Sequence, residues 1–148
     1  MAWIELTEME VLSRLANDEV EALKTAATNS EQPDVVSKII SMCVQEWRGL
    51  IRRHHAVSGG NTIPAELEGH VLADIRYRLF TRLPGMKALL DDRRVAEWDE
   101  SNRTKGRLKD YVFETPDTSE ATAEMPQAGI EIAKVDARIF TRESMRGL

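Results

Sequence analysis

The amino-acid sequence predicts an all-α fold: a small helical bundle of about four to five helices with an extended C-terminal arm. Large apolar residues recur at steps of three and four along several stretches before residue 103, as they do on the buried face of amphipathic helices. Helix-start signals precede these stretches. After Phe113 the composition becomes acidic and poor in large apolar side chains, which is typical of a segment that cannot offset its ordering entropy by burial.

The first two helices are short. In "LTEMEV", Thr7 and Glu10 have the spacing of a capping box, with Leu6 and Val11 placed as a hydrophobic staple. This pattern predicts a helix to about residue 15. Asn17 is then expected to cap a second helix, "DEVEALKTAA", which "TNSEQP" closes.

Three longer helices follow. Pro33 and Asp34 suit the first turn of a helix that continues to about His55. Pro64 is expected to begin the next one, which "PG" ends at residues 84 and 85, and a further helix is predicted from about residue 86 to residue 102. The expected apolar residues of these helices are Val36, Ile39, Ile40, Cys43, Trp47, Leu50 and Ile51, then Leu67, Val71, Ile75 and Leu79, then Leu89, Leu90, Val95 and Trp98.

The chain divides by composition into a helical domain, residues 1–113, a flexible acidic linker, residues 114–129, and a C-terminal arm, residues 130–148. Residues 1–113 hold 16 basic and 18 acidic side chains, and the rest of the chain holds 4 and 7. A chain of 148 residues is long enough for one hydrophobic core. Because only 5% of the residues are aromatic, we expect this core to consist mainly of aliphatic side chains. We expect no membrane span and no signal peptide, because no long apolar run exists and "MAWIELTEME" is acidic.

No pattern of catalytic or metal-binding residues stands out. His54 and His55 are adjacent, so on a helix they point about 100 degrees apart and cannot act as an i, i+4 metal pair. Cys43 is the single cysteine, which excludes an intramolecular disulfide and predicts a small buried side chain. Phosphate-binding glycine loops and nucleophile motifs are absent from the sequence. We therefore expect no cofactor, no metal and no enzymatic activity.

The stretch "DIRYRLF" combines an expected ion pair with candidate contact residues. Asp74 and Arg78 are four residues apart in the favourable acid-first order. Arg76, Tyr77 and Phe80 are residue types that are enriched in contacts between subunits, and we identify them as candidate interface residues. Ordinary packing within one chain is the alternative that the sequence leaves open.

The C-terminal arm carries the other candidate interface residues. Its basic residues recur every four positions, which places them on one face, and its apolar residues offer anchors. The candidates are Arg138, Arg142 and Arg146, with Phe140, Met145 and Leu148. The linker can span several tens of angstroms at ~3.3 Å per residue, so the arm can reach a neighbouring molecule. The alternative is that it folds back on its own bundle.

A second class of function is a small helical nucleic-acid-binding regulator. "WRGLIRRHH" would place Arg48, Arg52 and His55 on one helix face. The formal charge of -5 argues against this interpretation, because polyanion binding depends on net positive charge.

Several segments together resemble one family. The capped N-terminal helices, the helix of "IPAELEGHVLADIRYRLF", the helix of "DDRRVAEW" and the ending "RIFTRESMRGL" look like the small Mu-like head-to-tail connector proteins of tailed bacteriophages, the head completion or adaptor proteins. The most specific part is the pairing of an Arg-Tyr-Arg-Leu helix with an Arg-x-Phe-x-Arg-x-x-Met-Arg-Gly ending. The stretch between residues 102 and 113 departs from the tidier helix end expected of that family.

The resemblance implies a non-enzymatic virion protein of the head-tail junction, the virion neck, that is assembled in the host cytoplasm. Its copies would form a homo-oligomeric ring, twelve-fold by the resemblance, beneath the portal protein, with DNA passing through the ring. Tail or neck proteins would be further partners. Extended terminal arms would hold neighbouring subunits, which matches the arm expected here.

Overall fold

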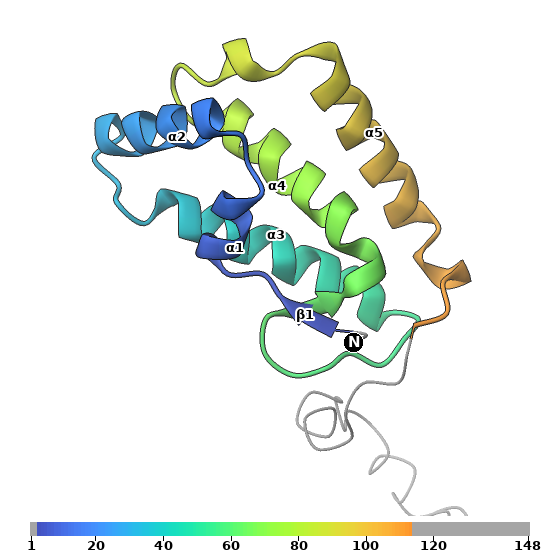
Figure 1. Ribbon diagram of the computed structural model, residues 1–148. Helices are drawn as coiled ribbons and strands as arrows, with labels where there is room; N and C mark the ends of the chain where they lie inside the picture. Colours follow the sequence, from blue (N-terminus) through green and yellow to red (C-terminus); the bar gives the residue numbers. More distant parts are fainter. Residues whose placement is uncertain (1–2, 114–148) are drawn as a thin grey trace, which may run out of the picture.

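The computed structural model describes residues 3–113, and these residues form the predicted all-α bundle with one small antiparallel sheet (Figure 1). Residues 114–148, which include the predicted linker and arm, lie outside the described part of the chain. The helices are α1 (Glu8–Ser13), α2 (Asn17–Asn29), α3 (Val35–Arg52), α4 (Glu68–Arg82) and α5 (Asp92–Gly106). The strands are β1 (Trp3–Glu5) and β2 (Thr62–Pro64), and short 3-10 turns η1, η2 and η3 span Ala65–Leu67, Lys87–Leu89 and Leu108–Asp110.

Helix α4 is the central element of the fold. Figure 1 shows it between α3 and α5, with α1 and α2 at the end of the bundle where α3 begins. The β1–β2 pair lies near the opposite end, where α3 ends. Apolar side chains from α1, α2, α3 and α4, with Ile63 of β2 and Leu108 of η3, form one continuous core. Within residues 3–113 no helix is both long and apolar enough to cross a membrane.

The predicted start of α1 is confirmed in detail. Thr7 accepts a hydrogen bond from the backbone N–H of Glu10, and the Glu10 carboxylate accepts one from the backbone N–H of Thr7, which completes the capping box. Leu6 and Val11 are both buried, as a hydrophobic staple requires. The prediction that Asn17 caps α2 was wrong. Ala16 is the N-cap, and its backbone N–H donates to the buried carboxylate of Glu19 at 3.0 Å.

The start of α4 differs from the prediction that placed it at Pro64. Residues 62–64 form β2 instead, and α4 begins at Glu68 after a 3-10 turn. Ile63 pairs with Ile4 of β1 and is fully buried. A strand pairing between distant segments has no local signature, so the sequence pattern could not reveal it.

The final helix is displaced toward the C-terminus from the predicted range 86–102. Asp91 caps it by accepting a hydrogen bond from the backbone N–H of Arg94 at 2.9 Å. The helix then continues to Gly106. Thr104 is buried and Lys105 forms an ion pair with Asp74 of α4, so tertiary contacts keep this weakly patterned stretch helical.

Arg48 is a structural residue of the bundle. Its side chain is only 1% exposed, and its guanidinium donates to the backbone carbonyl oxygens of Thr62 and, at 2.7 Å, Ser58. These contacts fasten the connection between α3 and β2 onto α3. Arg48 therefore cannot contribute to the basic helix face that a nucleic-acid-binding function would use.

We predict that Arg48→Lys lowers the free energy of unfolding by about 1–3 kcal/mol, because one ammonium group cannot reproduce the forked pair of bonds to two carbonyl oxygens. Urea denaturation measures this change. The matched control is Arg53→Lys at the exposed end of α3, which should change the free energy by less than about 0.5 kcal/mol. Equal effects of the two substitutions would contradict the role assigned to Arg48.

Candidate functional site

The predicted ion pair of α4 is present and buried. Arg78 Nε lies 3.0 Å from Asp74 Oδ1, and the Asp74 residue is 1% exposed. A carboxylate in this position must be satisfied by donors within the protein, because leaving it unpaired would cost several kcal/mol. Its remaining donors come from the two neighbouring helices.

Asp74 thereby links three helices. Trp47 of α3 donates its indole N–H to Asp74 Oδ2 at 2.9 Å, and Lys105 Nζ of α5 lies 2.7 Å from the same oxygen. The Lys105 ammonium also stands 5.1 Å from the centre of the Trp47 ring, within range of a cation–π interaction. Glu46 of α3 completes the cluster by pairing with Arg78 at 2.6 Å and with Lys105 at 3.2 Å.

The cluster keeps its acids ionised. Burial alone would raise the pKa of Asp74, but the hydrogen bonds from Lys105 and Arg78 outweigh it and hold this pKa below the ordinary value. Burial alone would also raise the pKa of Glu46, but the hydrogen bonds from Arg78 and Lys105 outweigh it and lower this pKa below its ordinary value. Cys43 faces the Asp74 carboxylate at 3.4 Å, and burial and this carboxylate together raise the pKa of its thiol far above the usual range. The thiol is therefore inert, as a buried small side chain should be.

A second polar cluster joins α2, α4 and α5. Glu19 of α2 is buried, and it pairs with Arg94 of α5 at 2.7 Å and with Arg76 of α4 at 3.7 Å. Glu97 of α5 closes the cluster by accepting from Arg76 at 3.2 Å and from Arg94 at 3.1 Å. Burial and the neighbouring Arg94 lower the pKa of Arg76, but these acids keep it paired.

The three candidate residues of α4 all have contacts within their own chain. Phe80 is fully buried in the core. Tyr77 stacks on Trp98 of α5 with the ring centres 4.0 Å apart and the rings 9° from parallel. Arg76 belongs to the cluster with Glu19. These contacts fit the alternative of packing within one chain, and the predicted role of the three residues between subunits stays a prediction.

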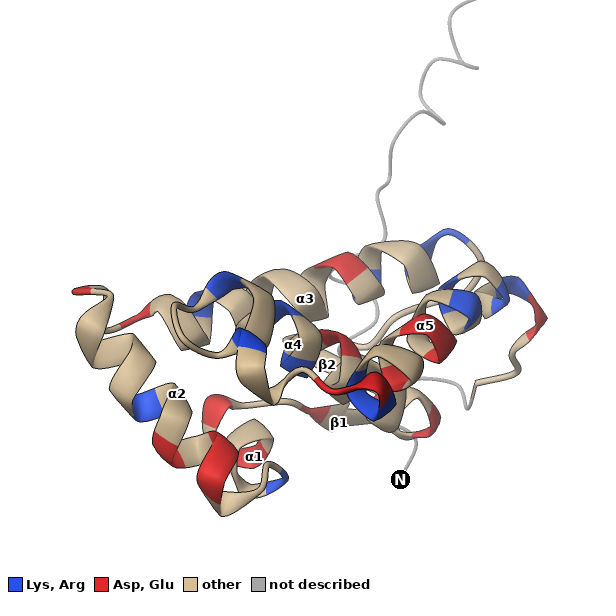
Figure 2. Cartoon of the chain, turned by 90° about the horizontal axis from the view of Figure 1, so that it is seen from above, with Lys and Arg blue, Asp and Glu red and all other residues tan. Residues whose placement is uncertain are grey.

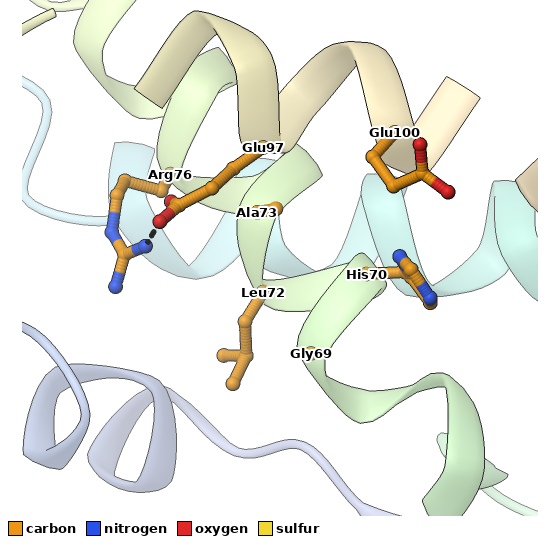
Figure 3. Close-up of a pocket in the computed structure, with 7 residues that line it drawn as sticks. All are labelled: Gly69, His70, Leu72, Ala73, Arg76, Glu97 and Glu100. Carbon is orange, nitrogen blue, oxygen red and sulfur yellow. Dashed lines mark hydrogen bonds and ion pairs between the residues drawn. The ribbon is translucent and has the colours of Figure 1, made fainter. Parts of the chain in front are cut away.

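A shallow groove runs between α4 and α5 beside this cluster, with a volume of about 420 Å³ (Figure 3). It is lined by Gly69, His70, Leu72, Ala73, Arg76, Glu97 and Glu100. Figure 3 shows Arg76 turned toward Glu97, to which it is bonded. The buried Ser101 of α5 donates to the backbone carbonyl oxygen of the lining residue His70 at 2.8 Å. The groove therefore holds polar groups that already have partners.

This groove does not assemble a recognisable catalytic constellation. Nucleophilic catalysis needs a hydroxyl or thiol beside a base that a third group orients, whereas the Ser101 hydroxyl is committed to a backbone oxygen. Nor does the part of the chain from residue 3 to residue 113 contain any group of three or more His, Cys, Asp and Glu side chains that could hold a metal ion.

An aromatic cluster lies at the C-terminal end of the described residues. Phe113 contacts His55 at the end of α3, with ring centres 4.8 Å apart, and Trp3 of β1 at 6.4 Å. Tyr111 stacks on Phe113 at 5.7 Å. The His55 ring is bonded through Nε2 to the backbone oxygen of Leu108 at 2.8 Å. One signal of this site is visible in the sequence, the aromatic residues just before the acidic segment, but it does not reveal their partners Trp3 and His55.

The other predicted interface residues belong to the C-terminal arm. They are Arg138, Phe140, Arg142, Met145, Arg146 and Leu148, and all of them lie outside the described residues.

We predict that Asp74→Asn lowers the free energy of unfolding at pH 7 by about 3 kcal/mol, because it removes the charge that Arg78 and Lys105 surround. The pKa of Asp74 is depressed in the folded protein, so its contribution is fully present above the unfolded value of about 3.9 and is lost as the pH falls through the folded value. Urea denaturation between pH 7 and pH 3 should therefore show the difference between wild type and variant narrowing below about pH 4.

The control for this measurement is Asp110→Asn, at an exposed position of η3, which should change the unfolding free energy by less than about 0.5 kcal/mol. A difference between wild type and Asp74→Asn that stays constant over the whole pH range would contradict the role of the ionised carboxylate.

We also predict that Cys43 does not react with a thiol reagent such as Ellman's reagent while the protein is folded, because burial and Asp74 disfavour the thiolate. One equivalent of thiol should react in 8 M urea. Since Cys43 is the single cysteine of the sequence, any rapid reaction in buffer would show that the helix pair around it opens.

Comparison of the chain with protein-family models, with curated proteins and with solved structures finds no match. The functional interpretation is therefore based on the residues and their geometry, together with the resemblance of the sequence motifs.

Proposed function

We propose that the protein is a structural virion protein of a tailed bacteriophage, which forms a ring at the portal and connects head to tail. In this proposal the helical bundle is the ring-forming body, and the C-terminal arm docks on a neighbouring subunit or connector protein. The portal protein and tail or neck proteins are its partners at the virion neck, and DNA passes through the ring, which the resemblance makes twelve-fold.

One observation carries this proposal: residues 3–113 build a closed core from their own side chains. Helices α1, α2, α3 and α4 contribute buried apolar residues to one continuous cluster, and β2 and η3 add Ile63 and Leu108. The large apolar residues of the arm, Phe140, Met145 and Leu148, are thus not needed to complete this core. Their combination with evenly spaced arginines favours burial against another molecule.

The position of the chain exit supports the same proposal. Phe113 is fastened against Trp3 and His55 at one end of the bundle, so everything beyond it starts from a fixed point. A linker of 16 residues that starts there can reach about 50 Å at ~3.3 Å per residue, which exceeds the diameter of a small domain. In a ring, each arm gains avidity because its neighbours are held close by.

The alternative function, a nucleic-acid-binding regulator, keeps a weaker basis. Arg48 is buried and holds backbone carbonyl groups, so it is removed from the proposed basic face. Arg52 and Arg53 are exposed at the end of α3. Binding of DNA by the isolated protein with a strong salt dependence, reduced by Arg53→Glu, would favour this function over the connector.

We predict that deleting residues 130–148 leaves the bundle folded but abolishes assembly with the portal protein of the same phage. The deletion removes the proposed anchors, whereas the core of residues 3–113 is self-contained. Circular dichroism and thermal unfolding should match those of the full chain. Light scattering of the mixture with the portal protein should show a complex for the full chain and separate components for the truncated one.

Substitutions in the full-length chain distinguish the loss of the apolar anchors from the loss of the arm as a whole. Phe140→Ala with Met145→Ala keeps every charge and should still lose the complex, whereas Thr141→Ala, on the same segment, should keep it. Normal assembly by the truncated protein would contradict the proposed role of the arm.

A further inference from the structure

Within residues 3–113, three cations without a carboxylate partner lie at the end of the bundle where α3 and α5 end. Arg53 caps the C-terminus of α3, Arg107 follows the last residue of α5, and Lys109 lies in η3. All three are exposed. The bond between His55 and the backbone oxygen of Leu108 holds the two helix ends together. We call Arg53, Arg107 and Lys109 the basic end, and Figure 2 shows where lysine and arginine lie along the bundle.

The basic end differs from the cations in the middle of the fold. Arg76, Arg78, Arg94 and Lys105 each pair with one or more carboxylates. Within residues 3–113 no carboxylate forms an ion pair with a residue of the basic end. The negative ends of the helix dipoles of α3 and α5 favour cations there, but they provide no anionic side chain as a partner. This surface therefore has positive charge to offer to an acidic group.

The linker brings acidic groups to this place. It follows Phe113, which contacts His55 directly, and it begins five residues after Lys109. Residues 114–129 contain four acidic side chains and no basic one. Glu114, Asp117 and Glu120 fall within the first seven linker residues, a reach of about 23 Å at ~3.3 Å per residue. A tether this short gives millimolar effective concentration.

We propose that the basic end binds the acidic linker of its own chain, through Glu114, Asp117 and Glu120. The contact holds the start of the linker on the bundle. Its strength is electrostatic, because all the basic groups are exposed. Salt screens such charges, with a Debye length of about 8 Å at 0.15 M. The contact should therefore form at low salt concentration and be lost at high salt concentration.

The proposal does not depend on the connector function. It concerns one isolated chain, and its test needs no portal protein. A negative result in the test of one proposal would therefore not contradict the other.

The test is nuclear magnetic resonance of the full-length, ¹⁵N-labelled protein in 20 mM salt. The variant Arg53→Glu/Lys109→Glu reverses the basic end. The matched control, Lys24→Glu/Lys38→Glu, makes the same change of charge on α2 and near the start of α3, away from the chain exit. We expect the amide signals of residues 114–121 to shift in the first variant and in 0.5 M salt, and to stay unchanged in the control.

Reciprocal variants complete the test. Replacing the three linker acids by Glu114→Gln, Asp117→Asn and Glu120→Gln should shift the amide signals of Arg53, Arg107 and Lys109. The same replacement should tighten binding of a 20-base-pair DNA duplex several-fold, and this gain should vanish in the Arg53→Glu/Lys109→Glu background.

Three outcomes would overturn the proposal. The first is that the amide signals of residues 114–121 do not shift when the charge of the basic end is reversed. The second is an equal response to the control variant, which would indicate long-range charge alone. The third is a gain in DNA binding that persists without the basic end. Circular dichroism of each variant confirms that the bundle is folded, so a loss of structure cannot be mistaken for any of these outcomes.

Discussion

A single buried carboxylate determines how the three long helices meet. Asp74 on α4 is ionised and almost fully buried, so it needs donors from its surroundings. Trp47 supplies one from α3, Arg78 one from α4 itself, and Lys105 one from α5. A shift of either neighbouring helix by one turn would remove a donor and leave buried charge unpaired. The register of α3 and α5 on α4 is thus set by polar chemistry within an apolar core.

Helix α5 shows the consequence most clearly. Its buried residues are Ser101 and Thr104, and none of its apolar side chains belongs to the buried core. Ion pairs hold it at both ends instead. Near its C-terminus Lys105 pairs with Asp74. Near its N-terminus Arg94 pairs with Glu19, and Glu97 pairs with Arg76. Because α5 is fixed in this way, η3 reaches the end of α3, where its backbone binds His55. The position of Phe113, the last described residue, follows from that placement.

Both functional proposals grow from this arrangement. The connector proposal relies on a core that residues 3–113 build from their own side chains, and the linker proposal relies on the exposed cations Arg53, Arg107 and Lys109. Arg76, Tyr77 and Phe80 have contacts within their own chain, in ion pairs, ring stacking and the core, and their role between subunits stays a prediction. The connector proposal therefore relies on the arm more than on the α4 face.

The sequence by itself determined the elements whose causes are local. The capping box of α1, the apolar stripe of α3 and the pair of Asp74 with Arg78 all join residues within a few positions of one another. Only the tertiary structure decided the pairing of β1 with β2, the burial of Arg48 and the contact of Glu19 with Arg94. The physical reason is that periodicity and capping report the conformation of one segment. Which distant groups satisfy a buried charge depends on how the segments pack, and no local pattern carries that information.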